Sequence, residues 1–547
     1  MARWPHRIAS VSERIGKLAV TALAEATSRG LRPFRYHIVS RAVLPDTSDL
    51  LALVKRHWGY AVFRPRQEAI VRTILAGRDV VAVMPTGGGK SLCYQLPALA
   101  LGRTAVVVSP LIALMQDQAA QLEQAGIPAA FLNSTLSGPE AAGIRRSAER
   151  GELRLLYLSP ERLVREDTLA WLTKLQVAFF AVDEAHCISE WGHEFRPEYR
   201  QLGRLRALFP DQPIAAFTAS ATRQVRHDIV RQLGLHEPGK FVLSFHRPNL
   251  RYVVRQCDGR QQLPLLLAAL DWYDEGHVIV YAPTIKGVEE TTRQLERRGL
   301  SAVAYHGRME AEERRRNQET WMSGEKRVLV GTIAFGLGIN KPDVRAVIHL
   351  SLPKSLEQYY QEAGRAGRDG EQADCVLLWQ KKDAGLLAWF VDQIQDPEEK
   401  ERSWRRYHTI RRFVETKQCR HRQICLHFGE SPRWDRCQAC DVCGVELDWL
   451  SAPARPAAEP IPRKRAGEKP PREAPSVDEN LRARLRAWRK EQAQQLGMPA
   501  YVILHDSTIE AICRLKPGSI GELLEAPGIG ERKAERFGKA ILSVVRG

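Results

Sequence analysis

The sequence lacks any long apolar run. No stretch reaches the roughly 18 consecutive apolar residues that a membrane-spanning helix needs, and the longest candidate, around Thr104–Met115, is interrupted by Ser109 and Pro110. The first residues also lack the apolar segment and cleavage site of a secretory signal. We therefore expect neither a membrane protein nor a secreted one.

Acidic residues are scarce relative to basic ones. The 547 residues include 81 Lys and Arg but 64 Asp and Glu, which leaves a net charge of +17. A basic surplus favours a polyanionic partner, usually nucleic acid, because each neutralised phosphate releases a counterion. A charge kept only for solubility is the alternative. The length predicts about three to four domains, and a hydrophobic fraction of 44% is enough for several cores.

Cysteine is sparse over most of the chain and concentrated in one segment. Five of the ten cysteines lie between residues 419 and 443. In a chain without an export signal, this clustering favours a metal site over a disulfide framework. Cys425 occupies an apolar position and is expected in the core, and a reduced cluster without metal is the alternative for the others. The expected ligands of a closed tetrahedral zinc site are Cys419, Cys437, Cys440 and Cys443, with His421 and His427 less favoured.

Short apolar runs alternate with helical patterns between about residues 50 and 380. Strands that alternate with helices predict parallel sheets covered on both faces. The two series of runs predict two α/β domains in tandem, with a boundary near Ser244–Pro248. The first series is 80–84, 105–108, 155–158, 178–182 and 214–217, and the second is 278–281, 302–305, 328–330, 346–349 and 375–379.

The ends of the chain have other compositions. The first 47 residues are basic and poor in acids, and Ser10–Ser28 fits an amphipathic helix. The preferred interpretation is a poorly ordered extension or a misassigned start, and an organelle transit peptide is the alternative. Residues 451–476 carry seven prolines and predict an extended linker. A helical pattern returns from Glu479 to the end.

A phosphate-binding loop is predicted where the first apolar run ends. The segment Pro85–Ser91 is rich in glycine and precedes a helical pattern. Glycines let backbone N–H groups wrap around phosphate oxygens, and a helix N-terminus adds a positive dipole. Lys90 is expected to reach the β- and γ-phosphates and Ser91 to hold Mg²⁺. A chance turn is the alternative, because the first glycine of the full motif is Met84 here. The residues expected around the phosphates are Thr86, Gly87, Gly88, Gly89, Lys90 and Ser91.

Two adjacent acids follow the apolar run 179–182. Asp183 is placed to bind the metal through water, and Glu184 to polarise the attacking water. Alone, such a pair is more often a solvated loop. About 90 residues after the Lys90 loop, it indicates a nucleoside triphosphatase.

Arg365 and Arg368 lie in the second predicted α/β domain. Arginines three apart on a helix share a face. From that face they are expected to project across an interdomain cleft onto the γ-phosphate and stabilise charge in the transition state. Two surface arginines on a basic helix are the alternative.

An aromatic-rich segment directly follows the acids. Trp191, His193, Phe195 and Arg196 interleave rings with a guanidinium beside the phosphate site. Such side chains can stack on bases and contact the nucleic-acid backbone. An aromatic core patch is the alternative.

With these motifs in this order, the sequence resembles the RecQ family of DNA helicases, within superfamily 2, over about Leu50–Gly444. By this resemblance Tyr60 stacks on adenine, Arg64 and Gln67 hold the base, and the aromatic-rich segment couples strand binding to hydrolysis. DEAH-type RNA helicases share the Asp-Glu-Ala-His spelling but not this loop. Residues Glu479–Gly547 resemble the helicase-and-RNase-D C-terminal (HRDC) module, although a protein-interaction bundle is nearly as well supported. By this resemblance the core of the helical bundle contains Trp488, Leu496, Pro499, Ala500, Tyr501, Ile503, Leu504, Leu515, Leu523, Leu524, Ile529 and Phe537.

The resemblance implies an α/β protein with two tandem RecA-like domains, a helical zinc-binding subdomain and a small C-terminal helical bundle. The expected boundaries are 1–47 for the basic extension, 48–246 and 247–380 for the RecA-like domains, 381–447 for the zinc-binding subdomain, 448–477 for the linker and 478–547 for the HRDC-like bundle. Residues 444–476 are too short and too rich in proline for the winged helix that the family commonly carries there.

The implied activity is ATP-dependent 3′-to-5′ translocation on single-stranded DNA and unwinding of tailed duplexes in repair and recombination, with ATP, Mg²⁺ and Zn²⁺ bound. A DNA-stimulated ATPase that remodels or anneals DNA with little unwinding is the alternative. An RNA-directed helicase and an ATP-switched binding scaffold are the rivals. The implied location is the bacterial cytoplasm at the nucleoid, or the nucleus or an organelle in a eukaryote.

Overall fold

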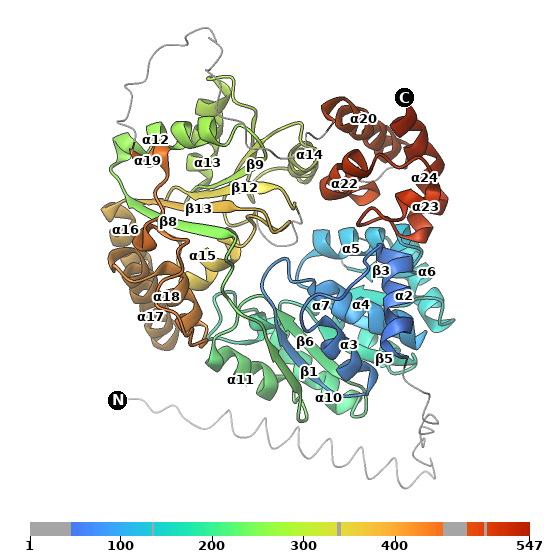
Figure 1. Ribbon diagram of the computed structural model, residues 1–547. Helices are drawn as coiled ribbons and strands as arrows, with labels where there is room; N and C mark the ends of the chain where they lie inside the picture. Colours follow the sequence, from blue (N-terminus) through green and yellow to red (C-terminus); the bar gives the residue numbers. More distant parts are fainter. Residues whose placement is uncertain (1–44, 134–135, 336–340, 452–477, 497–499) are drawn as a thin grey trace, which may run out of the picture. The chain divides into compact units, whose positions relative to one another are not determined.

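The computed structural model describes residues 45–133, 136–335, 341–451, 478–496 and 500–547 (Figure 1). The segment Ser10–Ser28 and most of the proline-rich segment lie outside these ranges. None of the described helices is both long and apolar enough to cross a bilayer.

The first sheet has seven parallel strands in the order β3-β4-β2-β5-β6-β1-β7. Its central strands are buried on both faces, which is why they read as continuous apolar runs in the sequence. Because β5, β6 and β1 are neighbours, the segments that follow them meet at one edge of the sheet. The strands are β1 (Val80–Val83), β2 (Thr104–Val108), β3 (Ala129–Leu132), β4 (Leu155–Leu158), β5 (Val177–Val182), β6 (Ile214–Thr218) and β7 (Gly239–Val242).

Four helices in this part of the chain, α2, α6, α7 and α11, begin at a side chain that caps them. Asp46 forms a capping box with Asp49 at the start of α2, and the Thr222 side chain accepts from the Val225 N–H at the start of α11. The helices are α2 (Thr47–Trp58), α3 (Gln67–Leu75), α4 (Lys90–Leu101), α5 (Ile112–Gln124), α6 (Gly138–Glu149), α7 (Pro160–Leu163), α8 (Glu166–Leu172), η1 (Ala185–Ile188), α9 (Pro197–Arg200), η2 (Gln201–Gly203), α10 (Arg204–Leu208) and α11 (Arg223–Gln232).

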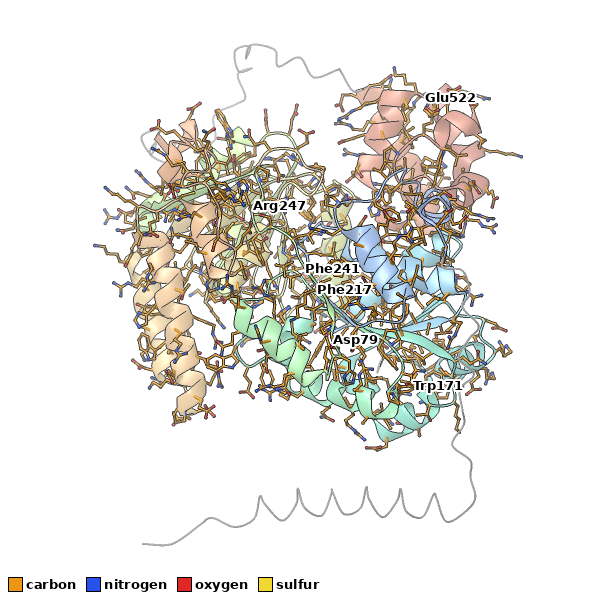
Figure 2. All side chains as sticks on the ribbon, turned by 60° about the horizontal axis from the view of Figure 1, so that its bottom comes forward. Asp79, Trp171, Phe217, Phe241, Arg247 and Glu522 are labelled. Atoms are coloured by element: carbon orange, nitrogen blue, oxygen red, sulfur yellow. The ribbon has the colours of Figure 1, made fainter. Side chains whose placement is uncertain are left out.

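Asp79, which is labelled in Figure 2 and directly precedes β1, connects segments that are far apart in the sequence. Its carboxylate accepts two hydrogen bonds from Arg206, at 2.8 and 2.7 Å. It also accepts from the backbone N–H groups of Ile214, at 2.8 Å, and His236, at 2.7 Å. This one side chain therefore fixes β6 and the approach to β7 against β1, at the end of the strand opposite to the glycine-rich loop.

The second sheet has six parallel strands in the order β10-β11-β9-β12-β13-β8. Two parallel sheets with helical connections confirm the predicted fold class. The strands are β8 (Leu250–Gln256), β9 (His277–Tyr281), β10 (Ala302–Tyr305), β11 (Val328–Gly331), β12 (Val344–His349) and β13 (Ala373–Trp379), and the helices are α12 (Gly259–Trp272), α13 (Ile285–Glu296), α14 (Ala311–Met322) and α15 (Leu356–Ala363).

The remaining described helices form two groups. A first group ends in the cysteine cluster and comprises α16 (Lys381–Asp392), α17 (Pro397–Glu415), α18 (Arg420–His427), η3 (Asp441–Cys443) and α19 (Asp448–Ser451). The C-terminal bundle comprises α20 (Glu479–Leu496), α21 (Ala500–Ile503), α22 (Asp506–Leu515), α23 (Ile520–Leu523) and α24 (Glu531–Arg546).

The core of the C-terminal bundle differs in part from the sequence prediction. Of the expected core residues, Ile503, Leu504, Leu523, Ile529 and Phe537 are buried. Leu496 and Leu515 are exposed instead, so the prediction is wrong for these two. Each is the last residue of its helix, and Leu515 also falls outside the buried stripe of Ile509, Ile512 and Cys513.

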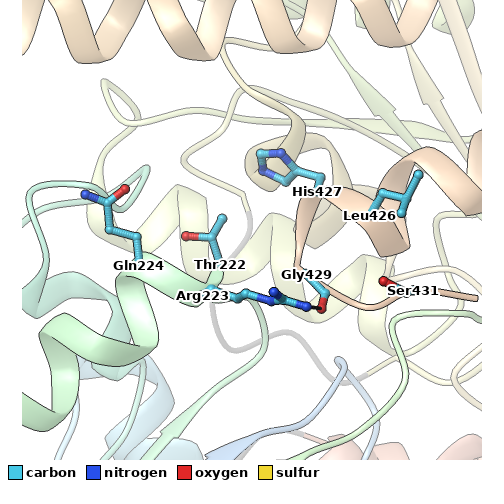
Figure 3. Close-up of a pocket in the computed structure, with 7 residues that line it drawn as sticks. All are labelled: Thr222, Arg223, Gln224, Leu426, His427, Gly429 and Ser431. Carbon is cyan, nitrogen blue, oxygen red and sulfur yellow. Dashed lines mark hydrogen bonds between the residues drawn. The ribbon is translucent and has the colours of Figure 1, made fainter.

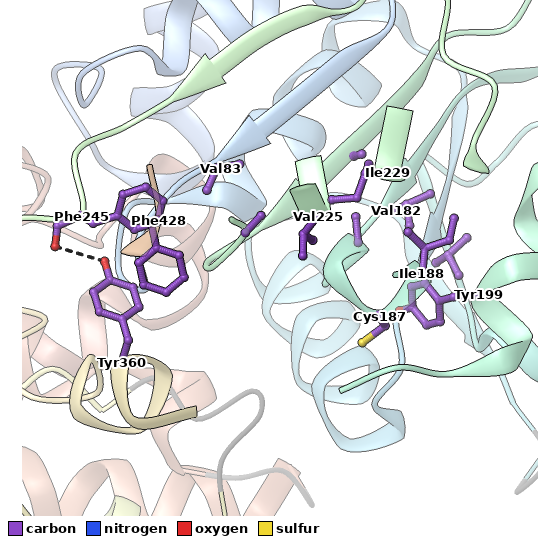
Figure 4. Packing of buried hydrophobic residues seen from close by; sticks show 14 of the residues in the cluster. Val83, Val182, Cys187, Ile188, Tyr199, Val225, Ile229, Phe245, Tyr360 and Phe428 are labelled. Carbon is purple, nitrogen blue, oxygen red and sulfur yellow. Dashed lines mark hydrogen bonds between the residues drawn. The ribbon is translucent and has the colours of Figure 1, made fainter. Parts of the chain in front are cut away.

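Aromatic packing joins the end of the first sheet to the second and to the cysteine-bearing helices (Figure 4). The rings of Phe245 and Phe428 stack with their centres 4.4 Å apart, and Tyr360 lies 5.0 Å from Phe428. The Tyr360 hydroxyl also donates to the Phe245 carbonyl at 3.4 Å. Residues from three predicted domains therefore share one cluster.

Candidate ATPase and DNA-coupling site

The glycine-rich loop after β1 has the backbone shape that its sequence requires. Gly87 and Gly89 adopt φ of 80° and 78°, values that favour glycine, and α4 begins directly afterwards at Lys90. Backbone N–H groups at the start of this helix and the Lys90 ammonium thus lie at the carboxyl edge of the sheet. This arrangement suits a phosphate chain.

Arg64 and Gln67 hold this loop from outside. Arg64 donates to the carbonyl of Gly87, and the Gln67 side-chain amide donates to the carbonyl of Gly89 at 3.1 Å. The Arg64 N–H in turn donates to the Gln67 side-chain oxygen at 2.8 Å. Tyr60 is 43% exposed and therefore accessible to a ligand. Arg64 and Gln67 border the loop, and the contact of Tyr60, Arg64 and Gln67 with a base stays a prediction.

Asp183 and Glu184 lie directly after β5, two strands away from the loop. Burial raises the pKa of Asp183 to about 7, helped by the neighbouring Glu184. Burial would also raise the pKa of Glu184, but the hydrogen bond with His186 and the charge of Lys90 lower it to about 2. The ring of His186 lies 3.3 Å from the Glu184 carboxylate and 3.0 Å from the Thr218 hydroxyl at the end of β6. The two acids therefore interact electrostatically with Lys90, and His186 links Glu184 to Thr218 at the end of β6.

The structure corrects the placement of Arg365 and Arg368. Helix α15 ends at Ala363, so the two arginines lie in the following turn and not on one helix face. Gly367, with φ of 54°, shapes this turn. Arg365 is buried, and the side chain of Arg368 lies against Gly87, whose added Cβ would come 3.6 Å from the Arg368 Cγ. Arg368 is therefore brought to the glycine-rich loop by a different local structure.

Arg247 is a residue that the sequence analysis missed. Its guanidinium donates to the carbonyls of Gly364, Ala366 and Gly367, at 3.3, 3.1 and 2.8 Å, and to that of Thr86 at 3.4 Å. It therefore links the arginine turn to the glycine-rich loop. Burial and the charges of Arg365 and Arg247 lower the pKa of Arg368 to about 9. An anion placed among these arginines would relieve that repulsion.

The aromatic-rich segment divides into outward and inward side chains. Trp191 and Phe195 are more than one third exposed, whereas the ring of His193 stacks on that of His186 with centres 4.7 Å apart. Arg196 pairs with Glu194 at 2.7 Å and donates to the Pro110 carbonyl at 3.2 Å, next to α5. The two exposed rings can reach a ligand, while His193 connects the segment to Glu184 through His186.

The four predicted zinc ligands come together. The sulfur atoms of Cys419, Cys437, Cys440 and Cys443 all lie within 4.8 Å of one another. Backbone N–H groups of Arg420 and Ala439 point at the sulfurs of Cys440 and Cys437, at 3.5 and 3.3 Å, as in sites that hold thiolates.

The other Cys and His residues of the segment are otherwise engaged. Cys425 is buried in the core, and burial raises the pKa of its thiol. His421 bonds the Leu250 carbonyl at 2.9 Å, and His427 pairs with Glu357 at 2.6 Å. These contacts leave the four thiols as the candidate ligands.

A further pocket, of about 500 Å³, lies between the start of α11 and α18 (Figure 3). Arg223 crosses it to donate to the Gly429 carbonyl at 2.9 Å. The other lining residues are Thr222, Gln224, Leu426, His427 and Ser431. None of the residues predicted for nucleotide or DNA, and none of the four cysteines predicted for zinc, lines this pocket.

Family models match four segments of the chain. They are described as DEAD/DEAH box helicase, over residues 64–228, Helicase conserved C-terminal domain, over 261–370, RecQ zinc-binding, over 381–444, and HRDC domain, over 478–545.

Curated proteins match nearly the whole chain. It is 33% identical over 594 residues to the ATP-dependent DNA helicase RecQ of Haemophilus influenzae, which covers 91% of this chain and 95% of that protein. It is 32% identical over 584 residues to the ATP-dependent DNA helicase RecQ of Bacillus subtilis, with 90% and 98% covered. Among solved structures, S. cerevisiae Dbp5 bound to RNA and ADP BeF3 has a TM-score of 0.50 at 17% identity, over 66% of this chain and 91% of that chain. This last likeness concerns the fold alone.

Proposed function

The chain belongs to the RecQ family of ATP-dependent DNA helicases, and from this premise we propose that it hydrolyses ATP to move 3′-to-5′ along single-stranded DNA and to separate tailed duplexes. The observation that supports the proposal is that three segments far apart in the sequence lie close together in the structure. The loop Pro85–Ser91, the acids after β5 and the turn that holds Arg368 lie close to one another. The basic charge of the chain suits the DNA.

In this proposal ATP binds against the glycine-rich loop. The residues Thr86, Gly87, Gly88, Gly89, Lys90 and Ser91 surround its phosphates, and Tyr60, Arg64 and Gln67 bind its base. Because Arg64 and Gln67 already bond carbonyls of the loop, base recognition and phosphate binding are mechanically linked. A nucleotide with the wrong base would therefore disturb the loop.

Hydrolysis is assigned to the acids and the arginines. Glu184, ionised beside His186, orients and deprotonates the attacking water, while Arg365 and Arg368 stabilise charge on the γ-phosphate. Ser91 and Asp183 would hold Mg²⁺, since a buried carboxyl and a hydroxyl beside a phosphate site fit this hard cation. The ion would neutralise phosphate charge.

We further assign Trp191, His193, Phe195 and Arg196 to DNA coupling. The exposed rings of Trp191 and Phe195 offer stacking surfaces for bases. When DNA binding moves the segment, His193, which stacks on His186, transmits this movement to His186 and Glu184. The thiols of Cys419, Cys437, Cys440 and Cys443 would bind a structural zinc ion, which supports folding of the subdomain.

We propose the same domain boundaries as the sequence predicts. We also propose that residues 444–476 do not form a winged helix, because this segment is too short and too rich in proline. A chain without this element fits either a helicase that splits duplexes unaided or an ATPase that remodels or anneals DNA with little unwinding. We favour the first, because relatives that match about 90% of the chain are named DNA helicases. The presence of Glu184 and both arginines argues against the other rival, a binding scaffold that uses ATP only as a switch. We place the activity where the chromosome lies, at the nucleoid in a bacterium or in the nucleus or an organelle of a eukaryote.

Lys90→Ala tests the ATP site. We expect no measurable hydrolysis, because the phosphates lose their cation at the loop, while Lys174→Ala, at an exposed residue of the same domain, keeps normal turnover. Trp191→Ala tests the coupling role, and should keep basal hydrolysis but lose most stimulation by single-stranded DNA. Normal turnover in Lys90→Ala or equal stimulation in Trp191→Ala would contradict the respective assignment.

A further inference from the structure

Helix α17 contacts three successive residues of the aromatic-rich segment, here called the aromatic-rich loop and taken as residues 190–196. The three residues are Glu190, Trp191 and Gly192. Arg402 and Arg405 place their guanidinium carbons 5.9 and 5.7 Å from the centre of the Trp191 ring. Arg402 also lies 3.5 Å from the Glu190 carboxylate. One residue further along the loop, the carbonyl of Gly192 accepts a hydrogen bond from Arg406 at 3.2 Å.

The arginines that make these contacts are themselves held in place. Residues three and four apart on a helix share a face, so Arg402, Arg405 and Arg406 project together. Glu399, one turn earlier, pairs with Arg402 at 3.1 Å and also with Arg406. Arg402 and Arg406 are only 12% and 19% exposed. Arg402 and Arg406 are therefore held in a fixed arrangement by Glu399 and are largely shielded from solvent.

The opposite side of the loop rests on the backbone that follows Glu184. A Cβ added at Gly192 would lie 2.8 Å from the His186 carbonyl and 3.0 Å from that of Ser189. The Gly192 N–H donates to the Ser189 carbonyl at 3.0 Å. Position 192 is thus enclosed between Arg406 on one side and residues 186–189 on the other. Glu184 lies 3.3 Å from His186 at the end of this chain of contacts.

We propose that Arg402 and Arg406 are positioning residues that seat the aromatic-rich loop on α17. When a base stacks on Trp191, the loop is held by α17. The base therefore displaces Trp191, and this displacement moves Gly192 and His193 and, through them, His186 and Glu184. Without the seat, the same displacement is absorbed by the loop. This inference rests on the proposed coupling role of Trp191.

The test uses the full chain with Arg402→Ala and Arg406→Ala. We expect maximal stimulation of hydrolysis by single-stranded DNA to fall by about 5–30-fold, the change in an equilibrium constant that a loss of about 1–2 kcal/mol produces. Basal hydrolysis should stay unchanged, because neither arginine contacts Glu184 or Lys90. Arg406→Lys should recover part of the stimulation, since an ammonium can also donate to the Gly192 carbonyl. Arg411→Ala is the matched control, because Arg411 lies on α17 but bonds Glu415 and Tyr407.

A second readout separates positioning from direct DNA contact. The DNA concentration that gives half-maximal stimulation, and its salt dependence, should match those of the unmodified chain. An arginine that neutralised a phosphate would instead lower the salt slope by about one when removed. A shallower slope together with weaker DNA binding would overturn the positioning role.

Two further variants keep the outcome unambiguous. Glu399→Gln loosens both arginines without removing them and should lower stimulation even if an alanine variant folds poorly. If Trp191→Ala loses stimulation while the α17 variants keep it, the positioning role of Arg402 and Arg406 is refuted and the coupling role of Trp191 is retained. If Trp191→Ala keeps stimulation, the coupling role fails and the seat fails with it.

Discussion

Replacement of Asp79 by alanine should destabilise the first sheet far more than a typical loss of an ion pair. Asp79 is 5% exposed and accepts four hydrogen bonds, two from Arg206 and one each from the N–H groups of Ile214 and His236. Removing one partner of a buried pair costs about 3–5 kcal/mol, because the other charge loses its compensation. Arg206 keeps the carbonyls of Gly234, Pro210 and Gln212, which limits this loss. We therefore expect about 3 kcal/mol for Asp79→Ala.

Native-state hydrogen exchange on peptides that cover β1 and β6 measures this loss of unfolding free energy directly. Asp167→Ala is the control, because Asp167 pairs with Arg165 and Arg145 but is 47% exposed. Such a surface pair is worth less than about 1 kcal/mol. Equal loss of protection in the two variants would refute the argument that Asp79 organises the sheet.

Three other predictions concern the site and the C-terminal regions. Arg247→Ala should lower kcat by about 100-fold, because the turn that carries Arg368 is no longer fixed to the loop, whereas Arg255→Ala, at an exposed residue of the same domain, should leave kcat unchanged. Cys440→Ser should abolish stoichiometric zinc in metal analysis and raise hydrogen exchange in α18 but not in β1; retained zinc would contradict the ligand set. Burial lowers the pKa of Lys533 to about 8, below its unfolded value, so the bundle binds fewer protons than its unfolded chain and its thermal midpoint should rise between pH 8 and pH 10. Lys533→Met should reduce this rise, and an identical pH dependence in both proteins would contradict the assignment.

The strands that the sequence predicted are those with a strong local signal. Central parallel strands such as β1 and β5 are buried on both faces and read as apolar runs. β3, β7 and β8 were not predicted. β3 and β7 are the edge strands of the first sheet, and β7 alternates partly buried and exposed residues, while β8 includes the polar residues Arg251, Arg255 and Gln256.

The parts of the site that depend on short segments were accessible from the sequence. The loop Pro85–Ser91, the acids after β5 and the cysteine cluster each lie within a few residues of a recognisable turn or strand. The helix predicted for Arg365 and Arg368 was wrong, because Gly364, Gly367 and Gly370 favour a turn, and that density of glycine was the available signal.

The remaining site residues depend on contacts between distant segments. Arg247 bonds residues 117 to 161 positions away, and Arg406 bonds a carbonyl 214 positions away. Among 81 basic residues, neither stands in a distinctive local pattern. Only the packing of the two sheets and α17 identifies them.

The measurement that tests the central claim most directly is ATP hydrolysis with single-stranded DNA, duplex DNA or single-stranded RNA, together with strand displacement on a 3′-tailed duplex. We predict strong stimulation by single-stranded DNA, weaker effects of the other two, and displacement that requires ATP. Stimulation by DNA without displacement would favour the remodelling alternative. Hydrolysis that does not respond to single-stranded DNA, or responds more to RNA, would contradict the proposal of a DNA helicase.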